Sequence, residues 1–587
     1  MSRLDLVLLH APSVYDFRKE SILYGPVSDL VPSTPVFEMY PIGFTTIAEY
    51  LERHGFRVRI VNLAVRMLRE RRFDPEAMIR SLNPRAFGID LHWMPHAHGA
   101  IEVARLVKKH HPNTPVFLGG FSSTYYHREL LAEYPEVDFV VRGDSTEEPM
   151  RQLMTVLRDG GNLADVDNLT WRGPDGQVRV NPIGFSPDTL DHVLLDYSYV
   201  IRSVARYRDL ASAIPFRHWL DYPITAALTC RGCTYGCKTC GGSARAYEQL
   251  HERQRPAYRS PSDLAQDLHS ISRFSKGPVF VLGDIRQPGM DYAEAFLAAV
   301  KGFPNPVILE LFEPASREFM QLVGRSLPHW TLEVSLESHD DEVRQAFGRP
   351  YTTAAMEKTM EYALEAGCER LDVFFMIGLP KQTYDSVMGT AEYCRHLVHD
   401  VDAGRNGQPR RLIPFISPLA PFLDPGSEVF ENPEAHGYRL LCRTVEEHRR
   451  ALVQPSWKYV LNYETAWMNR DQIVDSTYAA GLALNRLKME TGIIPRAVGE
   501  ATEKRIHKAR RLIAQIDDIM SMADAGLRAK LLRALKPQVD SANISTVCEK
   551  SELELPLGWA KLNVPAAATV ILRDLRRRLA RPEQKAG

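Results

Sequence analysis

The chain has 587 residues, of which 44% are hydrophobic and 25% are charged, and its formal net charge is −1 at pH 7. This composition is ordinary for a soluble globular protein. The near-zero charge excludes a global basic field for binding nucleic acid, so we expect no nucleic-acid partner. Because hydrophobic cores stop growing near ~250–300 residues, this length predicts more than one domain.

No apolar run reaches ~18 residues, so we expect no membrane span. The beginning, MSRLDLVLLHAPS, contains Asp5 and His10 and predicts a first strand better than a signal peptide. Eight cysteines in such a chain predict a reduced, cytoplasmic protein rather than a disulfide-linked one.

Residues 1–200 alternate between strand and helix patterns. Strands are predicted at Asp5–His10, Phe56–Asn62, Ala86–Leu91, Val116–Leu118 and Val137–Val141. Helices are predicted at Pro41–His54, Gly99–His111, His127–Tyr134 and Glu147–Arg158. This alternation predicts an α/β fold with a doubly wound, Rossmann-like parallel sheet. Such sheets bind ligands beyond the carboxyl ends of their strands.

Glycines lie at two of those carboxyl ends. Gly119-Gly120 follows the fourth strand, and Gly143 in the run RGDSTE follows the fifth. Neither loop is a GxGxxG fingerprint, so a nicotinamide or flavin dinucleotide is not indicated. The segments Asn168–Trp171 and Gln177–Val180 predict a small hairpin, and Tyr197–Tyr222 then links to the next domain.

The stretch TCRGCTYGCKTCGG contains four of the eight cysteines, Cys230, Cys233, Cys237 and Cys240. The last three have the spacing CxxxCxxC, which can hold three irons of a [4Fe–4S] cluster and leave the fourth iron open. Zinc is the alternative, because the stretch also contains two CxxC pairs. Only three residues separate the pairs here, whereas structural zinc sites usually have about 12–20.

Residues 221–430 repeat strand and helix patterns six times. The predicted strands are Ile224–Leu228, Pro278–Leu282, Val307–Phe312, Leu332–Leu336, Leu371–Ile377 and Ile413–Ser417. The predicted helices are Pro261–Arg273, Arg317–Val323, Asp341–Phe347 and Thr352–Glu365. They predict a partial (β/α)6 TIM-type barrel with its chemistry at the carboxyl ends of the strands.

Residues 431–587 carry no motif and predict helices that cap the barrel and shape a substrate pocket. The predicted helical segments are Asn432–Gln454, Thr465–Thr491, Gly499–Asp524, Leu527–Leu535 and Ala568–Leu579. Trp457, Tyr459, Tyr463 and Trp467 are aromatic candidates for that pocket or, equally, for the core.

The cysteine stretch resembles the cluster loop of the radical S-adenosylmethionine (SAM) enzymes, whose CxxxCxxC signature often follows Arg-Gly. The resemblance implies that Cys233, Cys237 and Cys240 ligate the cluster, that SAM chelates the open iron, and that Cys230 lies outside the signature. The residue before the last cysteine is often aromatic in that family, and here it is Thr239.

Later strand ends also resemble that family. Glu337-Ser338 is similar to a Glu-Ser pair whose carboxylate lies near the SAM ribose, and Gly378-Leu379-Pro380 is similar to a GLP turn that approaches adenine. Many members carry Gly-Gly-Glu where this chain has Gly283-Asp284. Asp284, Arg286 and Gln287 are therefore candidates for orienting the substrate.

The order of the YPIG helix, the GG loop and the RGD-S-TEE loop resembles the cobalamin-binding domain that precedes many radical SAM barrels. In that family the corrin lies at the sheet edge and the dimethylbenzimidazole tail runs beside the glycine loops. The resemblance implies contacts from Gly119, Gly120, Ser122, Ser123, Gly143 and Thr146, with the loops at Pro12 and His92 facing the corrin.

The lower axial position of cobalt is a separate question. Cobalamin proteins with a histidine ligand carry DxHxxG after the first strand, and this chain does not. Asp90-Leu-His92 half-matches the motif, but after the third strand. A histidine at a strand end is more often a packed or surface residue, so we expect cobalamin without a protein histidine on cobalt.

Together these resemblances imply a cobalamin-dependent radical SAM methyltransferase. It would act on an unactivated carbon through a 5′-deoxyadenosyl radical and methylcobalamin, with an electron donor such as flavodoxin or ferredoxin. The substrate, whether a small molecule, a peptide or a lipid, is not indicated. Three alternatives stay open: a radical cyclase or rearrangement enzyme, a non-catalytic corrin-binding protein, and a radical enzyme whose first domain binds the substrate instead of cobalamin.

Overall fold

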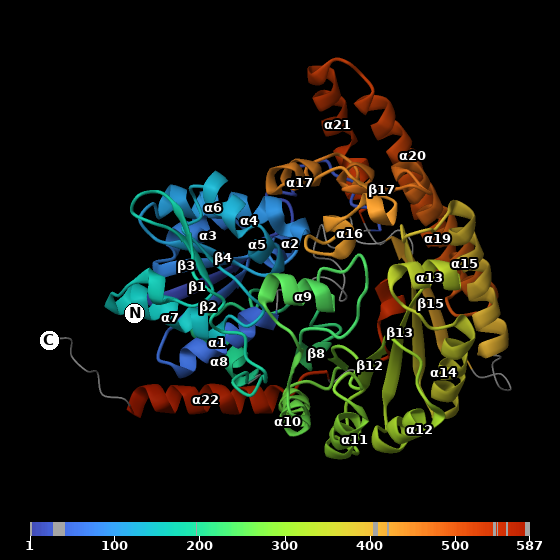
Figure 1. Ribbon diagram of the computed structural model, residues 1–587, viewed down its shortest axis with the longest axis horizontal. Coiled ribbons are helices and arrows are strands. Elements are labelled where there is room, and N and C mark those ends of the chain that lie inside the picture. The colour runs from blue at the N-terminus through green and yellow to red at the C-terminus, as the bar shows by residue number, and fades with distance from the viewer. Residues whose placement is uncertain are drawn as a thin grey trace.

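The computed structural model describes residues 3–26, 42–194, 197–402, 409–418, 422–543, 548, 550–558 and 561–580. Pro41, the first residue of a predicted helix, lies outside them. Figure 1 shows a first α/β unit on the left, a second one on the right, and helices from the last part of the chain above and below them. None of the helices in the described ranges is both long and apolar enough to cross a membrane.

The first unit is built on a seven-stranded sheet with the order β2-β1-β3-β4-β5-β6-β7. Its strands are β1 (Leu4–His10), β2 (Val58–Asn62), β3 (Pro84–Asp90), β4 (Val116–Gly119), β5 (Phe139–Val141), β6 (Leu169–Arg172) and β7 (Val178–Val180). The first five are parallel, which confirms the doubly wound prediction. The predicted hairpin β6–β7 continues the same sheet in antiparallel register.

Helices cover both faces of this sheet, and both faces are apolar. Leu6 and Leu8 pack with α1 and α7, while Val7 and Leu9 pack with the core on the other face, which includes Ile101 of α4. The helices are α1 (Ile42–Arg53), α2 (Leu63–Arg69), α3 (Pro75–Ser81), α4 (Ala97–His110), α5 (Phe121–Tyr125), α6 (His127–Glu133) and α7 (Glu147–Asp159). A central strand buried on both faces explains the unbroken apolar run of β1.

The second unit is a six-stranded parallel sheet with the order β15-β14-β13-β12-β11-β8. Its strands are β8 (Thr225–Ala227), β11 (Val279–Val281), β12 (Val307–Leu311), β13 (Trp330–Glu337), β14 (Arg370–Ile377) and β15 (Leu412–Pro418). Its helices are α10 (Pro261–Ser272), α11 (Met290–Ala299), α12 (Arg317–Ser326), α13 (Asp341–Phe347), α14 (Thr353–Glu365) and α15 (Tyr384–His396). All six predicted strands are confirmed, and neighbours in sequence are neighbours in the sheet, as in a partial barrel.

The cysteine stretch folds between the two units. Its first residues form β9 (Cys230–Arg231), which pairs with β10 (Ala257–Tyr258) in antiparallel register. Helix α9 (Ala244–His251) follows the last cysteine of the stretch and lies between the two units in Figure 1.

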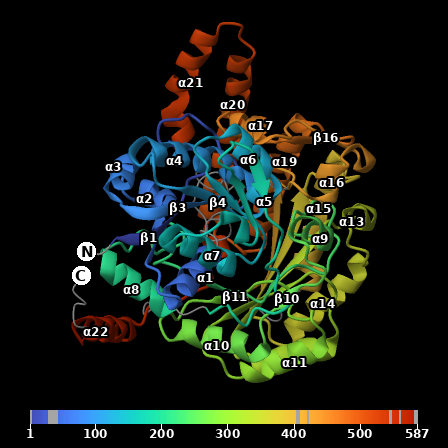
Figure 2. The ribbon, with the colours of Figure 1, turned by 60° about the vertical axis from the view of Figure 1, so that its left-hand side comes forward.

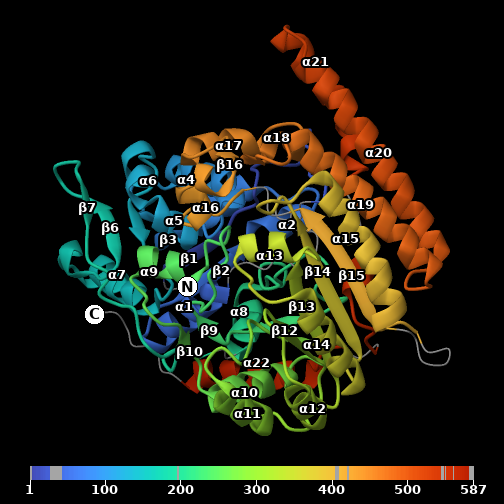
Figure 3. The ribbon, with the colours of Figure 1, turned by 45° about the vertical axis from the view of Figure 1, so that its right-hand side comes forward.

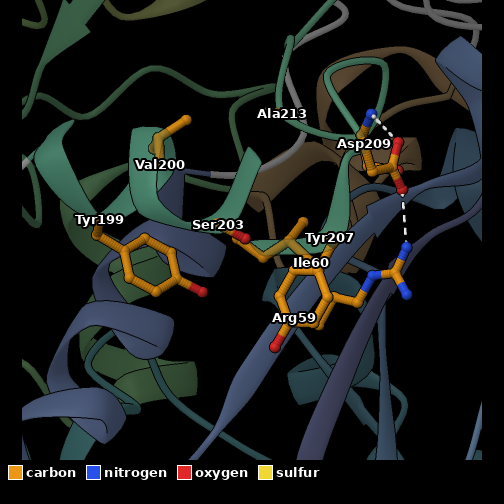
Figure 4. Close-up of a pocket in the computed structure, with 9 residues that line it drawn as sticks. Arg59, Ile60, Tyr199, Val200, Ser203, Tyr207, Asp209 and Ala213 are labelled. Atoms are coloured by element: carbon orange, nitrogen blue, oxygen red, sulfur yellow. Dashed lines mark hydrogen bonds and ion pairs between the residues drawn. The ribbon is translucent and has the colours of Figure 1, made fainter. Parts of the chain in front are cut away.

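The linker contains α8 (Tyr197–Tyr207), which contacts the edge strand β2 through the hydrogen bond that the Tyr199 hydroxyl donates to the Val58 carbonyl at 3.4 Å. Figure 4 shows Arg59 of β2 held between Tyr207 and Asp209. Its guanidinium lies 4.6 Å from the centre of the Tyr207 ring and 3.0 Å from the Asp209 carboxylate. The hollow there measures about 20 Å³, room for one water molecule, so this contact is structural.

The last part of the chain departs from its prediction near Asn432–Gln454. That segment is not one helix, because Tyr438–Leu440 forms strand β16 and pairs with β17 (Tyr463–Thr465). The helices are α16 (Glu428–Glu431), α17 (Val445–Leu452), α18 (Trp457–Val460), α19 (Arg470–Glu490), α20 (Arg496–Met520), α21 (Ala525–Asp540) and α22 (Val564–Ala580). Helix α19 packs against β15 and α15, and α20 and α21 form a hairpin that projects beyond the rest (Figures 2 and 3).

The first and last parts of the chain are joined around Trp457. Leu23 accepts a hydrogen bond from the Trp457 amide at 2.9 Å, and its own amide donates to Pro455 at 3.0 Å. The indole of Trp457 is fully buried and donates to the Tyr478 hydroxyl at 3.0 Å. Trp457 is therefore a core residue.

We predict that Trp457→Ala lowers the free energy of unfolding by about 3–5 kcal/mol, because it leaves a large cavity and removes the hydrogen bond to the Tyr478 hydroxyl. Urea unfolding followed by circular dichroism measures this. Leu572→Ala is the control, since Leu572 is 57% exposed and its loss should change stability by less than about 0.5 kcal/mol. Equal effects of the two variants would contradict the assignment.

Candidate active site

A buried ion pair joins the cysteine stretch to the first unit. Arg231 donates two hydrogen bonds to the Glu147 carboxylate, at 2.8 and 2.5 Å, and Thr46 donates a third at 2.6 Å. Glu147 is fully buried and begins α7. Burial disfavours its charge, but Arg231 and the donated hydrogen bonds outweigh burial and hold the Glu147 pKa well below its ordinary value.

A second buried pair lies beside the first. Arg253 pairs with Asp144 through two of its nitrogens, and it also donates to the Pro187 carbonyl at 2.8 Å. The Arg253 side chain is 2% exposed and that of Asp144 is 3% exposed. Bidentate, desolvated pairs of this kind fix geometry as well as charge, so the RGD-S-TEE loop and the cysteine stretch are held in one position.

An apolar cavity of about 330 Å³ lies next to these pairs, at the carboxyl ends of β1, β3, β4 and β5. Side chains of both units line the cavity. Leu8, Phe117 and Met150 come from the first unit, and Leu228 and Tyr247 come from the second. The cavity therefore extends from the sheet of the first unit to the cysteine stretch.

Five of the residues predicted to contact cobalamin line this cavity: His92, Gly119, Gly120, Gly143 and Thr146. Ser122 and Ser123 do not, because their hydroxyls donate to the carbonyls of His92 and Gly120 at 3.3 and 2.9 Å. These serines therefore stabilise the loop after β4, while Gly119 and Gly120 in the same loop line the cavity.

Pro12 lies away from the cavity lining and packs against α4. A Cβ atom on Gly99 would lie 1.6 Å from the Pro12 carbonyl oxygen, and the Gly99 amide donates to Ser13 at 3.0 Å. Pro12 thus fixes the loop after β1 against the start of a helix.

A buried cluster of three histidines and one carboxylate lies where β1 and β3 end. His10 and His92 each place Nδ1 on the same oxygen of Asp90, at 2.9 and 3.0 Å. His96 Nδ1 lies 3.3 Å from the Ala11 carbonyl, and its ring centre lies 4.9 Å from that of His92. Burial disfavours the charge of Asp90, but the two imidazoles keep its pKa well below the ordinary value.

Ligand atoms of His10, Asp90 and His96 come within 4.8 Å of one another, and no other such group occurs in the described ranges. The sulfur atoms of Cys233, Cys237 and Cys240 do not all lie within 4.8 Å of one another. A tetrahedral zinc ion would bring its sulfur ligands to about 4 Å from one another. The thiols are therefore spread more widely than a single zinc ion requires, which suits a larger cluster.

The cysteine loop is held by contacts with the end of α13, the start of α16 and the loop that precedes α16. Lys238 donates its amide to Phe347 at 2.9 Å, and its ammonium pairs with Glu428 at 2.7 Å. The Gly241 amide donates to Asp424 at 2.9 Å. Gly348 is required where it stands, since its φ is +104° and a Cβ atom would lie 2.7 Å from the Gly236 carbonyl.

Glu337 and Arg349 lie beside Cys237. Glu337 sits at a bulge in β13 with φ of +66°, and its carboxylate is 4.0 Å from the Arg349 guanidinium. Burial raises the Glu337 pKa to about 7, although Arg349 opposes the rise. Arg349 lies between the rings of Tyr235 and Phe312, at 4.7 and 4.8 Å. This places a cation beside the cysteine loop.

The backbone of the Gly-Leu-Pro turn, which includes Pro380, is held by hydrogen bonds with nearby side chains. The Gln382 side chain accepts from the amides of Gly378 and Leu379 at 2.7 and 3.2 Å, and Tyr438 donates to the Gly378 carbonyl at 2.6 Å. Ser338 is fully buried, and its hydroxyl accepts from the Asp340 amide at 3.1 Å. Gly378 and Ser338 thus shape the backbone around Glu337.

The three candidates for orienting the substrate separate into two roles. Asp284 and Arg286 pair with each other at 2.5 Å, and Arg286 also donates to the Glu313 and Pro314 carbonyls. This pair braces its own loop. Gln287 instead directs its amide nitrogen to Cys233 Sγ at 3.9 Å, and its buried Oε1 has no hydrogen-bond partner in the described part of the chain.

Sequence reasoning missed Glu147, Asp144 and Arg253 as parts of the site. In the sequence, Arg231 stands out only as part of the Arg-Gly pair that precedes the cysteine signature. The sequence does show acidic residues after β5 of the first unit and arginines in and after the cysteine stretch, and these opposite charges could have suggested ion pairs. Pairing them requires knowing that the two edges face each other.

Two family models match the chain. The B12 binding domain matches residues 30–152, and the radical SAM superfamily matches residues 228–394. Both matches agree with the fold, and the chain therefore joins a B12 binding domain to a radical SAM domain, as its motifs indicated.

Two curated relatives differ in their named activity. Hopanoid C-3 methylase of Methylococcus capsulatus is 27% identical over 57% of this chain and 60% of its own length, less than two thirds of that protein. Anaerobic magnesium-protoporphyrin IX monomethyl ester cyclase of Rubrivivax gelatinosus is 28% identical, but over 25% of each protein.

Two solved structures share the fold at low identity. The methyltransferase TsrM from Kitasatospora setae, with cobalamin and a [4Fe–4S] cluster bound, has a TM-score of 0.55 at 15% identity, over 88% of this chain and 100% of that one. The cobalamin-dependent SAM radical enzyme OxsB, with aqua-cobalamin and SAM bound, has a TM-score of 0.56 at 12% identity, over 98% of this chain and 80% of that one.

We predict that Glu147→Gln lowers the free energy of unfolding by about 3–5 kcal/mol, because it leaves the buried Arg231 guanidinium without an anion. The ordinary pKa of this carboxyl is 4.5, and the folded value lies below it. The stability that Glu147 contributes is therefore present above pH 4.5 and is lost as the pH falls through the lower folded pKa. Urea titrations from neutral to acidic pH should show a shallower acid dependence in the variant.

Glu148→Gln is the matched control for that experiment. Glu148 is the next residue, and its pair with Arg151 is partly exposed, so its loss should cost about 1 kcal/mol or less. A cost from Glu147→Gln no greater than that from Glu148→Gln would show that the interdomain pair does not stabilise the fold.

Proposed function

We propose that this chain, which joins a B12 binding domain to a radical SAM domain, is a cobalamin-dependent radical SAM methyltransferase acting on an unactivated carbon. The observation that carries the proposal is the position of the cavity. Gly119 and Gly143 of the first unit line it together with Cys230 and Arg231, which stand two or three residues before Cys233. One cavity therefore adjoins both cofactor loops.

The residues of the cysteine loop suit an iron–sulfur cluster. Burial raises the pKa of Cys237 to about 11, so this thiol needs nearby positive charge to bind as a thiolate. Arg349 supplies some of that charge, and iron would supply the rest. Cys233, Cys237 and Cys240 are the three ligands, and Cys230 is outside the set.

The cavity of the first unit suits the tail of cobalamin. A flat aromatic base fits among apolar side chains, and Leu8, Ile47, Phe117, Val141 and Met150 provide them here. The glycines of the two loops allow close approach of the backbone. The cobalamin contacts that we propose are those of His92, Gly119, Gly120, Gly143 and Thr146.

When bound, the cluster with SAM supplies radical chemistry and cobalamin supplies a methyl group. The protein holds these groups and keeps water out. Glu337 offers a carboxylate to the ribose hydroxyls of SAM, and Arg349 keeps that carboxylate beside the cluster loop. Gln287, with its unpartnered Oε1 near Cys233, is the stronger candidate for contacting bound SAM or substrate, while Asp284 and Arg286 hold the loop that carries it.

We further infer a reducing, cytoplasmic setting and a small electron donor such as flavodoxin or ferredoxin. The described part of the chain includes all eight cysteines and shows no disulfide bond among them, which suits a reducing compartment. The substrate class stays open among small molecules, peptides and lipids. A radical cyclase is the second candidate, because the cyclase relative aligns with a quarter of the chain.

We predict that changing Cys233, Cys237 and Cys240 together to Ala removes iron and sulfide from protein purified without oxygen, because the three ligands are lost. Bound cobalamin should remain, since its site lies in the other unit. Cys230→Ala is the matched control and should retain its iron. Iron unchanged in the triple variant, or lost from Cys230→Ala alone, would refute this ligand set.

We predict that Gly119→Leu lowers cobalamin content at least about tenfold while iron content is unchanged. Among the described residues, a Cβ atom there meets only the Val141 carbonyl, at an ordinary 3.7 Å, so the backbone tolerates a side chain that fills the cavity. A leucine side chain in this cavity would compete with the cofactor for the same space, and overpacking of this kind costs about 1–3 kcal/mol of binding free energy. Gly558→Leu is the control, because no residue in the described ranges lies within 4 Å of the Gly558 Cβ position. Normal cobalamin content in Gly119→Leu would place the cofactor elsewhere.

A further inference from the structure

We propose that helix α22 binds an anionic lipid surface, so that the protein works as a peripheral membrane protein. This inference does not rest on the proposed chemistry, because α22 contributes no residue to the lining of the cavity. Three observations carry it: a row of exposed apolar side chains, arginines beside that row, and the attachment of the opposite face of the helix to the rest of the protein.

Exposed apolar side chains gather on this helix. In the described ranges, nine large apolar side chains are exposed, and four of them lie between residues 562 and 575. Val564, Leu572 and Leu575 are 69%, 57% and 48% exposed. Leu562, just before the helix, is 38% exposed, and Ala568 is exposed as well. The spacing 564, 568, 572 and 575 places these helical residues on one face, and we call them the apolar row. Single exposed apolar residues are normal, whereas a contiguous group indicates a surface that binds something.

Arginines accompany the apolar row. Arg573 and Arg576 are exposed, and neither pairs with an acidic side chain in the part of the chain that the structure describes. Arg576 follows Leu572 by four positions, so the two are neighbours on the helix surface. Residues 561–587 contain seven Lys or Arg and two Asp or Glu, although the whole chain has a formal net charge of −1. Basic residues beside an apolar face are typical of helices that lie in the membrane interface, where they attract anionic lipids.

The other face of α22 is attached to the protein. Val570 is 8% exposed, and α22 packs against α8. Asn563 fixes the beginning of the helix, because its amide donates to the Phe274 carbonyl at 2.8 Å and its side chain donates to the Arg273 carbonyl at 3.0 Å. Figures 1 and 2 show α22 at the outer edge of the molecule, next to α8. The apolar row therefore faces outward while its helix is held in place.

A second copy of this chain fits the apolar row less well than a lipid surface does. A protein interface of standard size takes about 20–30 residues from each partner, whereas the row consists of four residues on one helix. Both copies would also bring the same excess of basic residues, which repel each other. An anionic lipid surface offers an apolar layer to the leucines and negative charge to the arginines, and such helices insert their apolar face about 5–10 Å deep.

The test is co-sedimentation of the full chain, purified without oxygen, with lipid vesicles. One set of vesicles contains phosphatidylcholine alone, and the other contains phosphatidylcholine and phosphatidylglycerol in equal amounts. We expect the protein to bind the mixed vesicles, less so as the salt concentration rises, and to bind the neutral vesicles at least about tenfold more weakly. Wild-type protein that does not bind the mixed vesicles, or that binds both kinds equally, would overturn the inference.

Variants of the apolar row identify the surface. Leu572→Glu together with Leu575→Glu should lower binding to the mixed vesicles at least about tenfold, because two charges would have to enter the apolar layer. The helix should persist, since glutamate is a good helix former and both positions are exposed, and circular dichroism checks this. Leu572→Met with Leu575→Met should retain binding, because methionine keeps the apolar surface.

Two further variants complete the experiment. Leu527→Glu is the matched control, because Leu527 is 44% exposed on another helix, α21, and its variant should bind as the wild type does. Arg573→Gln with Arg576→Gln should weaken binding to the mixed vesicles about tenfold, since two attractive charges are lost. Full binding by the double glutamate variant, or an equal loss in Leu527→Glu, would overturn the inference. So would light scattering that shows a wild-type dimer and a monomeric double glutamate variant, because the row would then join two copies of the chain.

Discussion

The ion pair between Arg231 and Glu147 is the constraint on which the arrangement of the site depends. It is buried, bidentate and shared between two units of the chain, so it fixes the start of the cysteine stretch against the start of α7. The Arg253–Asp144 pair adds a second point of attachment. Two fixed points between the two units leave them little freedom to rotate, and the cavity between them keeps its shape as a result.

Several polar residues that the sequence offers as ligand contacts form hydrogen bonds that hold loops instead. The hydroxyls of Ser122 and Ser123 hold the glycine loop, and Asp284 with Arg286 holds the loop after β11. What remains open to a ligand is apolar surface, glycine backbone, His92 and the thiols. That is a suitable lining for large cofactors that perform the reaction themselves, because the protein's task is to place them and keep water out.

The sequence predicted the strands of both sheets and the cysteine run, because these depend on short-range patterns that burial on both faces or a fixed ligand spacing imposes. It failed where long-range pairing decides the outcome. Glu147 and Arg231 are 84 positions apart, and no local pattern joins them. Local periodicity predicts helix at Tyr438–Leu440, whereas pairing with β17, 25 positions away, makes this segment a strand. The pairing of Asp284 with Arg286 is local, but it depends on the conformation of the loop, which the sequence does not give.

The account is tested most directly by the iron, sulfide and cobalamin content of the unmodified chain purified without oxygen, together with its visible spectrum. The account predicts about four irons and one cobalamin per chain, since a [4Fe–4S] cluster and a corrin would occupy adjoining sites. Four irons without cobalamin, even after reconstitution, would contradict the central claim that the cavity of the first unit binds cobalamin. Absence of iron would contradict the assignment of the cysteine loop.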